Sequence, residues 1–124
     1  MTARDDRFRD ACVDAGAFGA VAVQRATREV IAGFAHAGIA APALLDRLLD
    51  LLLGTVRPGG PLTQLCGGSP PSAARELYVA GRERSLYCMV LERGEVIVVA
   101  APSTMSVALG WTLVRGLAAT EHAR

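Results

Sequence analysis

The pattern of hydrophobic and polar positions divides the first third of the chain into short elements. An apolar stripe at helical spacing predicts a helix over residues 4–15, ended by Gly16; its members are Phe8, Ala11, Cys12 and Ala15. Residues 17–23 are small and apolar at every position, which is typical of a strand covered on both faces. After a polar turn at 25–28, residues 30–35 are apolar again and predict the returning strand of a hairpin.

A leucine-rich segment over residues 43–53 follows and predicts a helix with Pro42 near its first turn. Its three charged residues share one narrow sector of the helical wheel: Asp46, Arg47 and Asp50. Its seven leucines cover the rest, an arc of roughly 200°, where a helix on one core needs little more than ~100°. We therefore expect this helix to contact both its own sheet and a second protein chain.

The second half of the chain predicts three more strands and a closing helix. Residues 57–74 are rich in proline and glycine and predict a flexible loop. Strands are predicted at 76–80, 86–91 and 95–101, joined by turns short enough for antiparallel hairpins. The last helix is expected to begin near Ser103 or Thr104 as its N-cap, with one apolar face formed by Val107, Trp111, Val114 and Ala118.

The order of elements is therefore α-β-β-α-β-β-β-α. Strands that are apolar on both faces need helices above and below them. The sequence predicts a single α/β domain over residues 1–124, a three-layer α/β/α sandwich with a central five-stranded antiparallel sheet.

Composition and charge exclude several classes of function. The chain has 124 residues, 52% of them hydrophobic and 20% charged, which predicts a globular fold. Its net charge of +1 and 5% aromatic content argue against a nucleic-acid-binding surface. The uncharged stretch 96–114 is interrupted by Pro102 and polar residues, so we interpret it as strand, break and helix rather than a membrane span.

The location expected from the sequence is the cytoplasm. The start of the chain is charged and lacks the apolar core of a signal peptide. The three cysteines, Cys12, Cys66 and Cys88, are odd in number and widely spaced, which is typical of reduced thiols.

No constellation of residues in the sequence predicts catalysis, a cofactor or a metal. His36 and His122 are far apart in the chain, and the serines have no His/Asp pattern beside them. Four acidic residues near the start could suggest a metal site: Asp5, Asp6, Asp10 and Asp14. They alternate with arginines, so a solvated helix face with i,i+4 ion pairs explains them better. We predict that the protein is not an enzyme and needs no cofactor.

Several segments, taken in their order, carry a resemblance to a known family. They are Gly19-Ala20-Val21-Ala22-Val23 running into Glu29-Val30-Ile31-Ala32, the leucine-rich segment, Glu76-Leu77-Tyr78-Val79-Ala80-Gly81, the strands at 86–91 and 96–102, and Gly110. Over residues 18–117, without the proline- and glycine-rich loop, this pattern resembles the roadblock family of small regulatory domains. The loop at 57–74 is longer than this resemblance leads us to expect.

The resemblance implies a dimer, either of two copies or with a related roadblock domain. The second strands would pair edge to edge, and the following helices would pack together across the two-fold axis. The implied interface comprises Val30, Ile31, Ala32, Phe34, Leu44, Leu48, Leu51 and Leu52. The residues themselves agree, because a strand without charge or proline would be an aggregation hazard as a free edge.

The resemblance also implies a partner. Bacterial members often act beside a small Ras-like GTPase, which they contact through the paired helices, and Asp46, Arg47 and Asp50 would border that surface. These three residues could instead be a polar stripe that keeps the helix soluble. Because Arg47 lies on a helix, it is poorly suited to act as an arginine finger, so any GTPase activation would be indirect.

Two functions remain open from the sequence. The first is a non-catalytic dimeric regulator or scaffold of a small Ras-like GTPase. The alternative is a structural subunit of a signalling or transport assembly, which pairs with a related domain and is indifferent to nucleotide.

Overall fold

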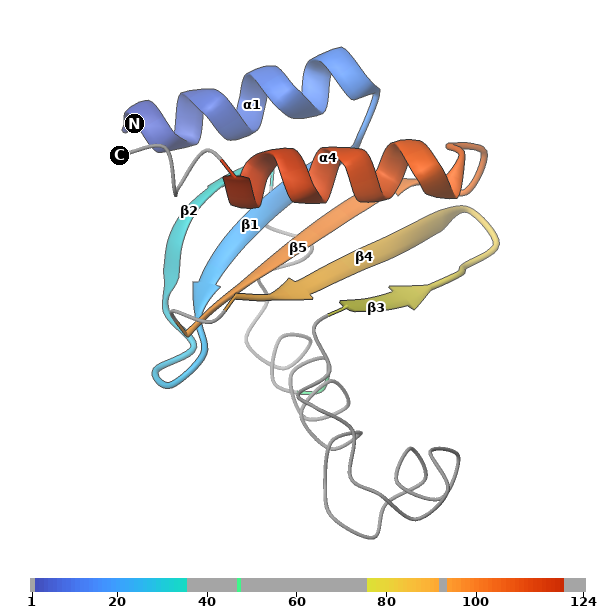
Figure 1. Ribbon diagram of the computed structural model, residues 1–124. Helices are drawn as coiled ribbons and strands as arrows, with labels where there is room; N and C mark the ends of the chain where they lie inside the picture. Colours follow the sequence, from blue (N-terminus) through green and yellow to red (C-terminus); the bar gives the residue numbers. More distant parts are fainter. Residues whose placement is uncertain (1, 36–46, 48–75, 92–93, 120–124) are drawn as a thin grey trace, which may run out of the picture.

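The computed structural model describes residues 2–35, 47, 76–91 and 94–119. Seven elements are defined in this part of the chain: α1 (Ala3–Ala15), β1 (Gly19–Gln24), β2 (Val30–Phe34), β3 (Glu76–Val79), β4 (Arg84–Val90), β5 (Glu95–Pro102) and α4 (Val107–Ala119). The strands form one antiparallel sheet in the order β2-β1-β5-β4-β3 (Figure 1). The predicted helix at 43–53 lies outside the described residues except for Arg47, which is helical, and the predicted loop at 57–74 lies wholly outside them.

The sheet is built around two long-range neighbours, β1 and β5. They pair from Gly19 opposite Ala100 to Gln24 opposite Glu95. Every residue between Val96 and Ala101 is buried, as are Ala20 to Val23 on β1. Their continuous runs of Ala, Val and Ile explain the position, because a strand apolar on both faces must lie in the middle of a covered sheet.

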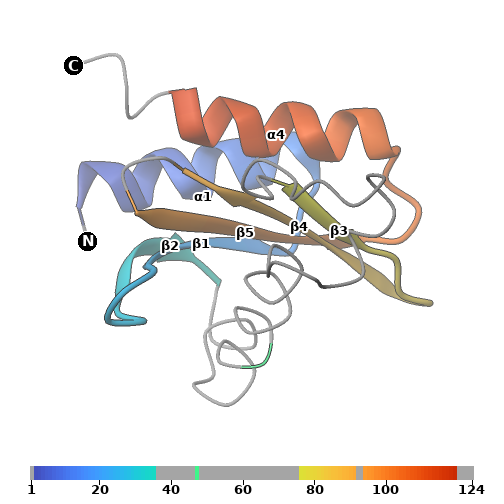
Figure 2. The same cartoon turned by 60° about the horizontal axis from the view of Figure 1, so that its bottom comes forward.

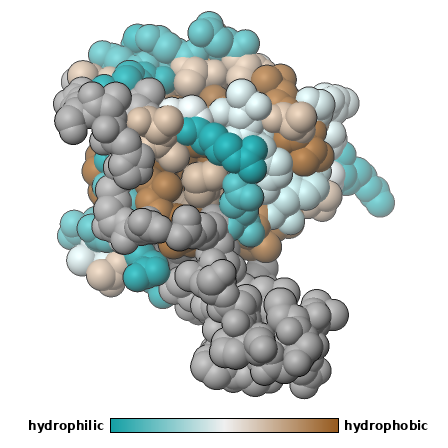
Figure 3. All heavy atoms as spheres, in the orientation of Figure 1, coloured by the Kyte–Doolittle hydropathy of each residue, from teal (hydrophilic) through white to brown (hydrophobic). Residues whose placement is uncertain are grey.

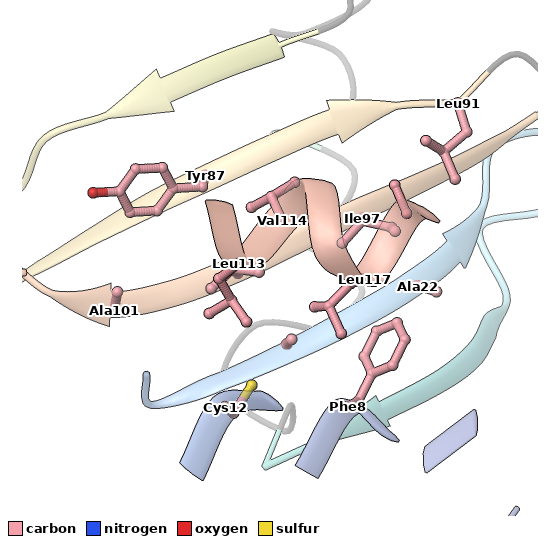
Figure 4. Close-up of a cluster of buried hydrophobic side chains, with 13 residues drawn as sticks. Phe8, Cys12, Ala22, Tyr87, Leu91, Ile97, Ala101, Leu113, Val114 and Leu117 are labelled. Carbon is pink, nitrogen blue, oxygen red and sulfur yellow. The ribbon is translucent and has the colours of Figure 1, made fainter. Parts of the chain in front are cut away.

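Both described helices cover the same face of the sheet (Figure 2). Phe8 and Cys12 of α1 and Leu113, Val114 and Leu117 of α4 meet there. They pack on sheet residues that include Ala20, Ala22, Tyr87, Ile97 and Val99 (Figure 4). The predicted antiparallel five-stranded sheet and both terminal helices are confirmed.

A second cluster of buried side chains lies on the opposite face of the sheet. It consists of Val21, Val23, Cys88, Val96, Val98 and Ala100. Neither α1 nor α4 lies on this face (Figure 2). The helix expected to cover it, at 43–53, falls outside the described residues apart from Arg47.

The start of α4 differs from the prediction. Ser106 is the residue whose hydroxyl accepts a hydrogen bond from the Leu109 N–H, so neither Ser103 nor Thr104 caps the helix. The Ser103 hydroxyl donates instead to the carbonyl of Arg82, and the Met105 N–H donates to the carbonyl of Pro102. This turn delays the helix, so Val107 falls in its first turn and is 45% exposed instead of joining the core.

The uncharged stretch 96–114 forms β5, a turn and most of α4, as predicted. No helix among the described residues is both long enough and apolar enough to cross a membrane.

The close packing of α4 on the sheet depends on Gly110. A Cβ placed on Gly110 would lie 2.6 Å from Cε1 of Tyr87 and closer still to two other ring carbons. The Tyr87 ring is fully buried and also contacts the rings of Tyr78 and Trp111, with centroid distances of 5.0 and 5.3 Å. The ring therefore has little room to move aside.

We expect Gly110→Ala to destabilise the protein by about 1–3 kcal/mol, the usual cost of overpacking a core. Gly116→Ala is the matched control on the same helix, because its Cβ would meet nothing within 4 Å. That variant should be about as stable as the wild type or slightly more stable, since alanine favours a helix. Denaturant unfolding of the two variants makes the comparison, and equal stabilities would contradict this account of the packing.

Candidate interaction surface

Strand β2 forms one edge of the sheet and exposes apolar side chains there. Val30 is 40% exposed and Ile31 41% exposed, and the strand from Val30 to Phe34 carries no charge. Within the described sheet its only neighbour is β1. An uncharged, exposed edge of this kind is a template for pairing with another strand.

The outer half of β2 contains a bulge. Ala22 pairs with Ala32 and Val23 pairs with Val30, so Ile31 is the extra residue between them. The bulge leaves the backbone of Ile31 outside the regular ladder with β1.

The other half of β2 is engaged in the fold of its own chain. Ala32 is 3% exposed, and Phe34 is half-buried against the core beneath α1 and α4. Of the four interface residues predicted on this strand, Val30 and Ile31 therefore present side chains at the surface. Ala32 and Phe34 direct theirs into their own domain.

The first turn of α1 is fastened to the sheet by two consecutive charged residues. The guanidinium of Arg4 forms an ion pair with Glu95 at the start of β5, with 2.7 Å between Nη2 and Oε1 and both side chains 15% exposed. The next residue, Asp5, contacts β2. Because β1 lies between β5 and β2, this one turn of helix spans three strands.

Asp5 uses its two carboxylate oxygens for different partners. Oδ2 accepts from the backbone N–H of Thr2 and from its hydroxyl, both at 2.9 Å, which completes a capping box at the start of α1. Oδ1 accepts the N–H of Gly33 on β2 at 2.8 Å. These hydrogen bonds, first from Thr2 and then from Gly33, lower the pKa of Asp5 from its ordinary 3.8 to about 2.

The remaining charges on α1 form local pairs in solvent. Arg9 lies 3.3 Å from Asp6 and 3.2 Å from Asp10, and the outer face of the helix is polar (Figure 3). The predicted solvated face is found at Asp6 and Asp10, which pair with Arg9 at i,i+3 and i,i+1 spacings, whereas the expectation was wrong for Asp5, whose carboxylate contacts the sheet.

The opposite edge of the sheet, β3, differs from β2 in charge and size. It has four residues and begins with Glu76, whose carboxylate lies 3.0 Å from Arg115 of α4. Tyr78 and Val79 are 38% and 36% exposed, and the Tyr78 ring packs on Tyr87. A short edge that begins with a charge is less suited to strand addition.

The predicted partner-binding residues are described at one position. Arg47 is helical and exposed, whereas Asp46 and Asp50 lie outside the described residues. The four predicted interface leucines also lie outside the described residues: Leu44, Leu48, Leu51 and Leu52. So do Cys66, His36 and His122.

The described residues offer little reactive chemistry. Burial raises the pKa of the Cys12 thiol to about 11 and that of Cys88 to about 12, so both remain protonated near neutral pH. Across residues 2–35, 47, 76–91 and 94–119, no three potential ligands gather into a metal site. A groove of about 430 Å³ between α1 and α4 is lined by apolar residues, by charged residues of α1 and by Thr112, whose hydroxyl donates to the carbonyl of Ala108.

Comparison with solved structures identifies the fold. MglB of Myxococcus xanthus superposes with a TM-score of 0.69 at 17% identity, over 92% of this chain and 80% of that one. A Roadblock/LC7 domain from Streptomyces avermitilis gives 0.64 at 16% identity, over 94% and 93% of the two chains. The described chain has the roadblock fold. Gliding protein MglB from Thermus thermophilus is also similar, with a TM-score of 0.61 at 19% identity over 94% and 87%.

Similarity at this level is confined to structure. No protein-family model and no curated protein matches the sequence. The similar solved structures therefore confirm the roadblock fold that the resemblance implied, and they do so through the arrangement of strands and helices.

Sequence reasoning missed the contact between Asp5 and the edge strand. Thr2 and Asp5 have the spacing of a capping box, which was a usable signal for the start of α1. Nothing local indicates that the second oxygen of Asp5 reaches Gly33, because the two residues meet only once α1 lies across the sheet.

The low pKa of Asp5 predicts a pH-dependent contribution to stability. A carboxylate whose pKa is lower in the folded state stabilises the fold at pH values above its unfolded pKa, and this contribution is lost as the pH falls through the folded pKa. The wild type should therefore exceed Asp5→Asn in stability by a constant amount above about pH 4, and the difference should shrink toward pH 2.

Denaturant unfolding followed by circular dichroism between pH 2 and pH 7 measures this difference. Asp10→Asn is the control, because it removes a carboxylate of the same helix whose contact is with Arg9 rather than with a strand. A difference between the wild type and Asp5→Asn that stays constant down to about pH 2 would contradict the assignment.

Proposed function

We propose that this protein is a non-catalytic dimeric regulator or scaffold that binds a small Ras-like GTPase in the cytoplasm. The observation that carries the proposal is the uncharged, apolar edge at Val30 and Ile31 in a chain with the roadblock fold. Two copies of such a strand can pair without bringing like charges together. The resemblance noted in the sequence supplies the partner class.

The dimer would form one continuous sheet through β2 of each copy. The leucine-rich segment at 43–53 would contribute Leu44, Leu48, Leu51 and Leu52 beside that seam. An arc of seven leucines is wider than one core needs, which supports a second contact surface there.

The GTPase would bind at the surface bordered by Asp46, Arg47 and Asp50. Arg47 is exposed, as a residue that contacts a partner must be in the free protein.

A second candidate is a structural subunit of a larger assembly that pairs with a related roadblock domain. A similar structure is described as MglB with a tetrameric arrangement, at 19% identity and a TM-score of 0.62, so a protein of this fold can belong to an assembly larger than a dimer. Such a subunit would have the same partners whatever the nucleotide.

Substitution of Ile31 by lysine tests the dimer. In a two-fold ladder the change places two positive charges near each other in an apolar seam, so we expect the dimer dissociation constant to rise at least about 100-fold. Val79→Lys is the matched control, because Val79 is an exposed β-branched residue on the opposite edge strand. Sedimentation velocity over a range of concentrations measures both variants.

The proposal requires that Ile31→Lys gives monomers and that Val79→Lys remains dimeric. The reverse result would move the interface to β3. A dimer that resists both substitutions would place the interface away from the sheet edges, and either outcome contradicts pairing through β2.

Affinity capture from the source extract, with GDP and with a non-hydrolysable GTP analogue in parallel, tests the GTPase. We expect a small GTPase to be enriched with the GTP analogue by the wild type and much less by Arg47→Glu, which reverses an exposed charge. Arg82→Glu, an exposed arginine in the β3–β4 turn, serves as the control. Identical partners in both nucleotide states would favour the structural subunit instead.

A further inference from the structure

The groove between α1 and α4 is a surface that the proposed function does not use. The two helices lie side by side and antiparallel over one face of the sheet (Figure 1). The groove of about 430 Å³ follows α1 from Arg7 to Asp14 and α4 from Thr112 to Leu117. Each wall is therefore roughly two helical turns long, which is enough for a third helix to contact both walls.

Gly116 lines this groove, and the described part of the chain gives no packing reason for a glycine there. A glycine in the interior of a helix costs about 1 kcal/mol relative to alanine. Gly110 is explained by the Tyr87 ring, which a Cβ would strike, whereas a Cβ on Gly116 would meet nothing within 4 Å. A helical glycine with open space beside it lets another molecule approach the backbone closely.

Leu109 extends the same side of α4 beyond the groove. Leu109, Leu113 and Gly116 have the i, i+4, i+7 spacing of residues that share one side of a helix. The Leu109 side chain is nevertheless 43% exposed. Val107 is similarly exposed at 45% but lies about 200° away around the helix, so it does not face the groove.

The charged residues that line the groove all come from α1. Asp10 and Asp14 are exposed and lie one turn apart, and Arg7 is at the other end, where it interacts within its own chain. Asp10 contacts Arg9 at 3.2 Å in an exposed pair, and such pairs are weak enough to exchange partners. The α1 wall is thus complementary to two basic residues one turn apart, whereas the α4 wall is complementary to apolar ones.

We propose that the groove between α1 and α4 docks an amphipathic α-helix of another protein. The apolar side of that helix packs on Leu109 and passes over Gly116, and two lysines or arginines at i and i+4 pair with Asp10 and Asp14. This inference goes beyond the proposed function and is independent of pairing through β2, because it uses no residue of the dimer or GTPase surface.

Two synthetic peptides of about 15 residues probe the groove, since shorter helices are marginal in water. Both carry a stripe of leucines on an alanine background. Beside that stripe, one peptide has two lysines a turn apart and the other has two glutamates. Fluorescence anisotropy with the full chain measures their dissociation constants. We expect the lysine peptide to bind at least about fivefold more tightly, and the double variant Asp10→Lys, Asp14→Lys to reverse this preference.

Matched variants test the two features of α4. Leu109→Ser removes the exposed apolar contact and Gly116→Leu fills the groove, so each should weaken binding of the lysine peptide about tenfold. Val107→Ser is the control for Leu109→Ser, because Val107 is equally exposed on the other side of the helix. Asp6→Lys reverses a charge of α1 outside the groove and controls for unspecific attraction. Both controls should keep the wild-type affinity, and thermal melts verify that each variant is folded.

Equal affinity of the wild type for the two peptides, or no binding of the lysine peptide at about 1 mM, would overturn the inference. Equal weakening by Leu109→Ser and Val107→Ser would do the same. Should Gly116→Leu fail to fold, Leu109→Ser still tests the groove. If sedimentation velocity shows that Leu109→Ser changes the oligomeric state, the groove holds a second copy of the chain and the inference falls. The result for Ile31→Lys leaves it unaffected, so its failure and that of the proposed function are distinguishable.

Discussion

Strand β2 is an edge strand of the described sheet, and this position is the constraint on which the rest of the molecule depends. The central strands are apolar on both faces, so helices must enclose the sheet, and α1 and α4 do so on one side. Within the described sheet, enclosure of the faces leaves β2 and β3 as the two edge strands. The short edge β3 begins with a charged residue, whereas β2 presents Val30 and Ile31 without any charge. An edge of the second kind needs either a partner or protection.

The first turn of α1 is where this edge is connected to the rest of the fold. Arg4 and Asp5 are consecutive, yet they reach strands on either side of β1. The carboxylate that completes the capping box of the helix is also the acceptor for the edge amide of Gly33. The start of α1 and the edge strand β2 are therefore linked through one side chain.

Much of the fold could be predicted from the sequence because its signals are local. The small apolar run at 17–23 and the stripe from Phe8 to Ala15 identify β1 and α1 without knowledge of their neighbours. The start of α4 was mispredicted, since several hydroxyl residues follow Pro102 and the choice among them depends on a tertiary contact between Ser103 and the β3–β4 turn. The resemblance to the roadblock family predicted that β2 lies at an edge of the sheet. The partial burial of Phe34 and the bulge at Ile31 could not be predicted, because they depend on packing and on strand register. The contact of Asp5 with Gly33 joins residues 28 positions apart and has no local signature.

Backbone hydrogen exchange along the two edge strands, measured as the protein concentration is raised, tests the central claim most directly. Pairing through β2 predicts that amides on this strand, including that of Ile31, become protected as the dimer forms, while the amides of β3 exchange at an unchanged rate. Protection that appears on β3, or a dimer that forms with no change on β2, would contradict the account.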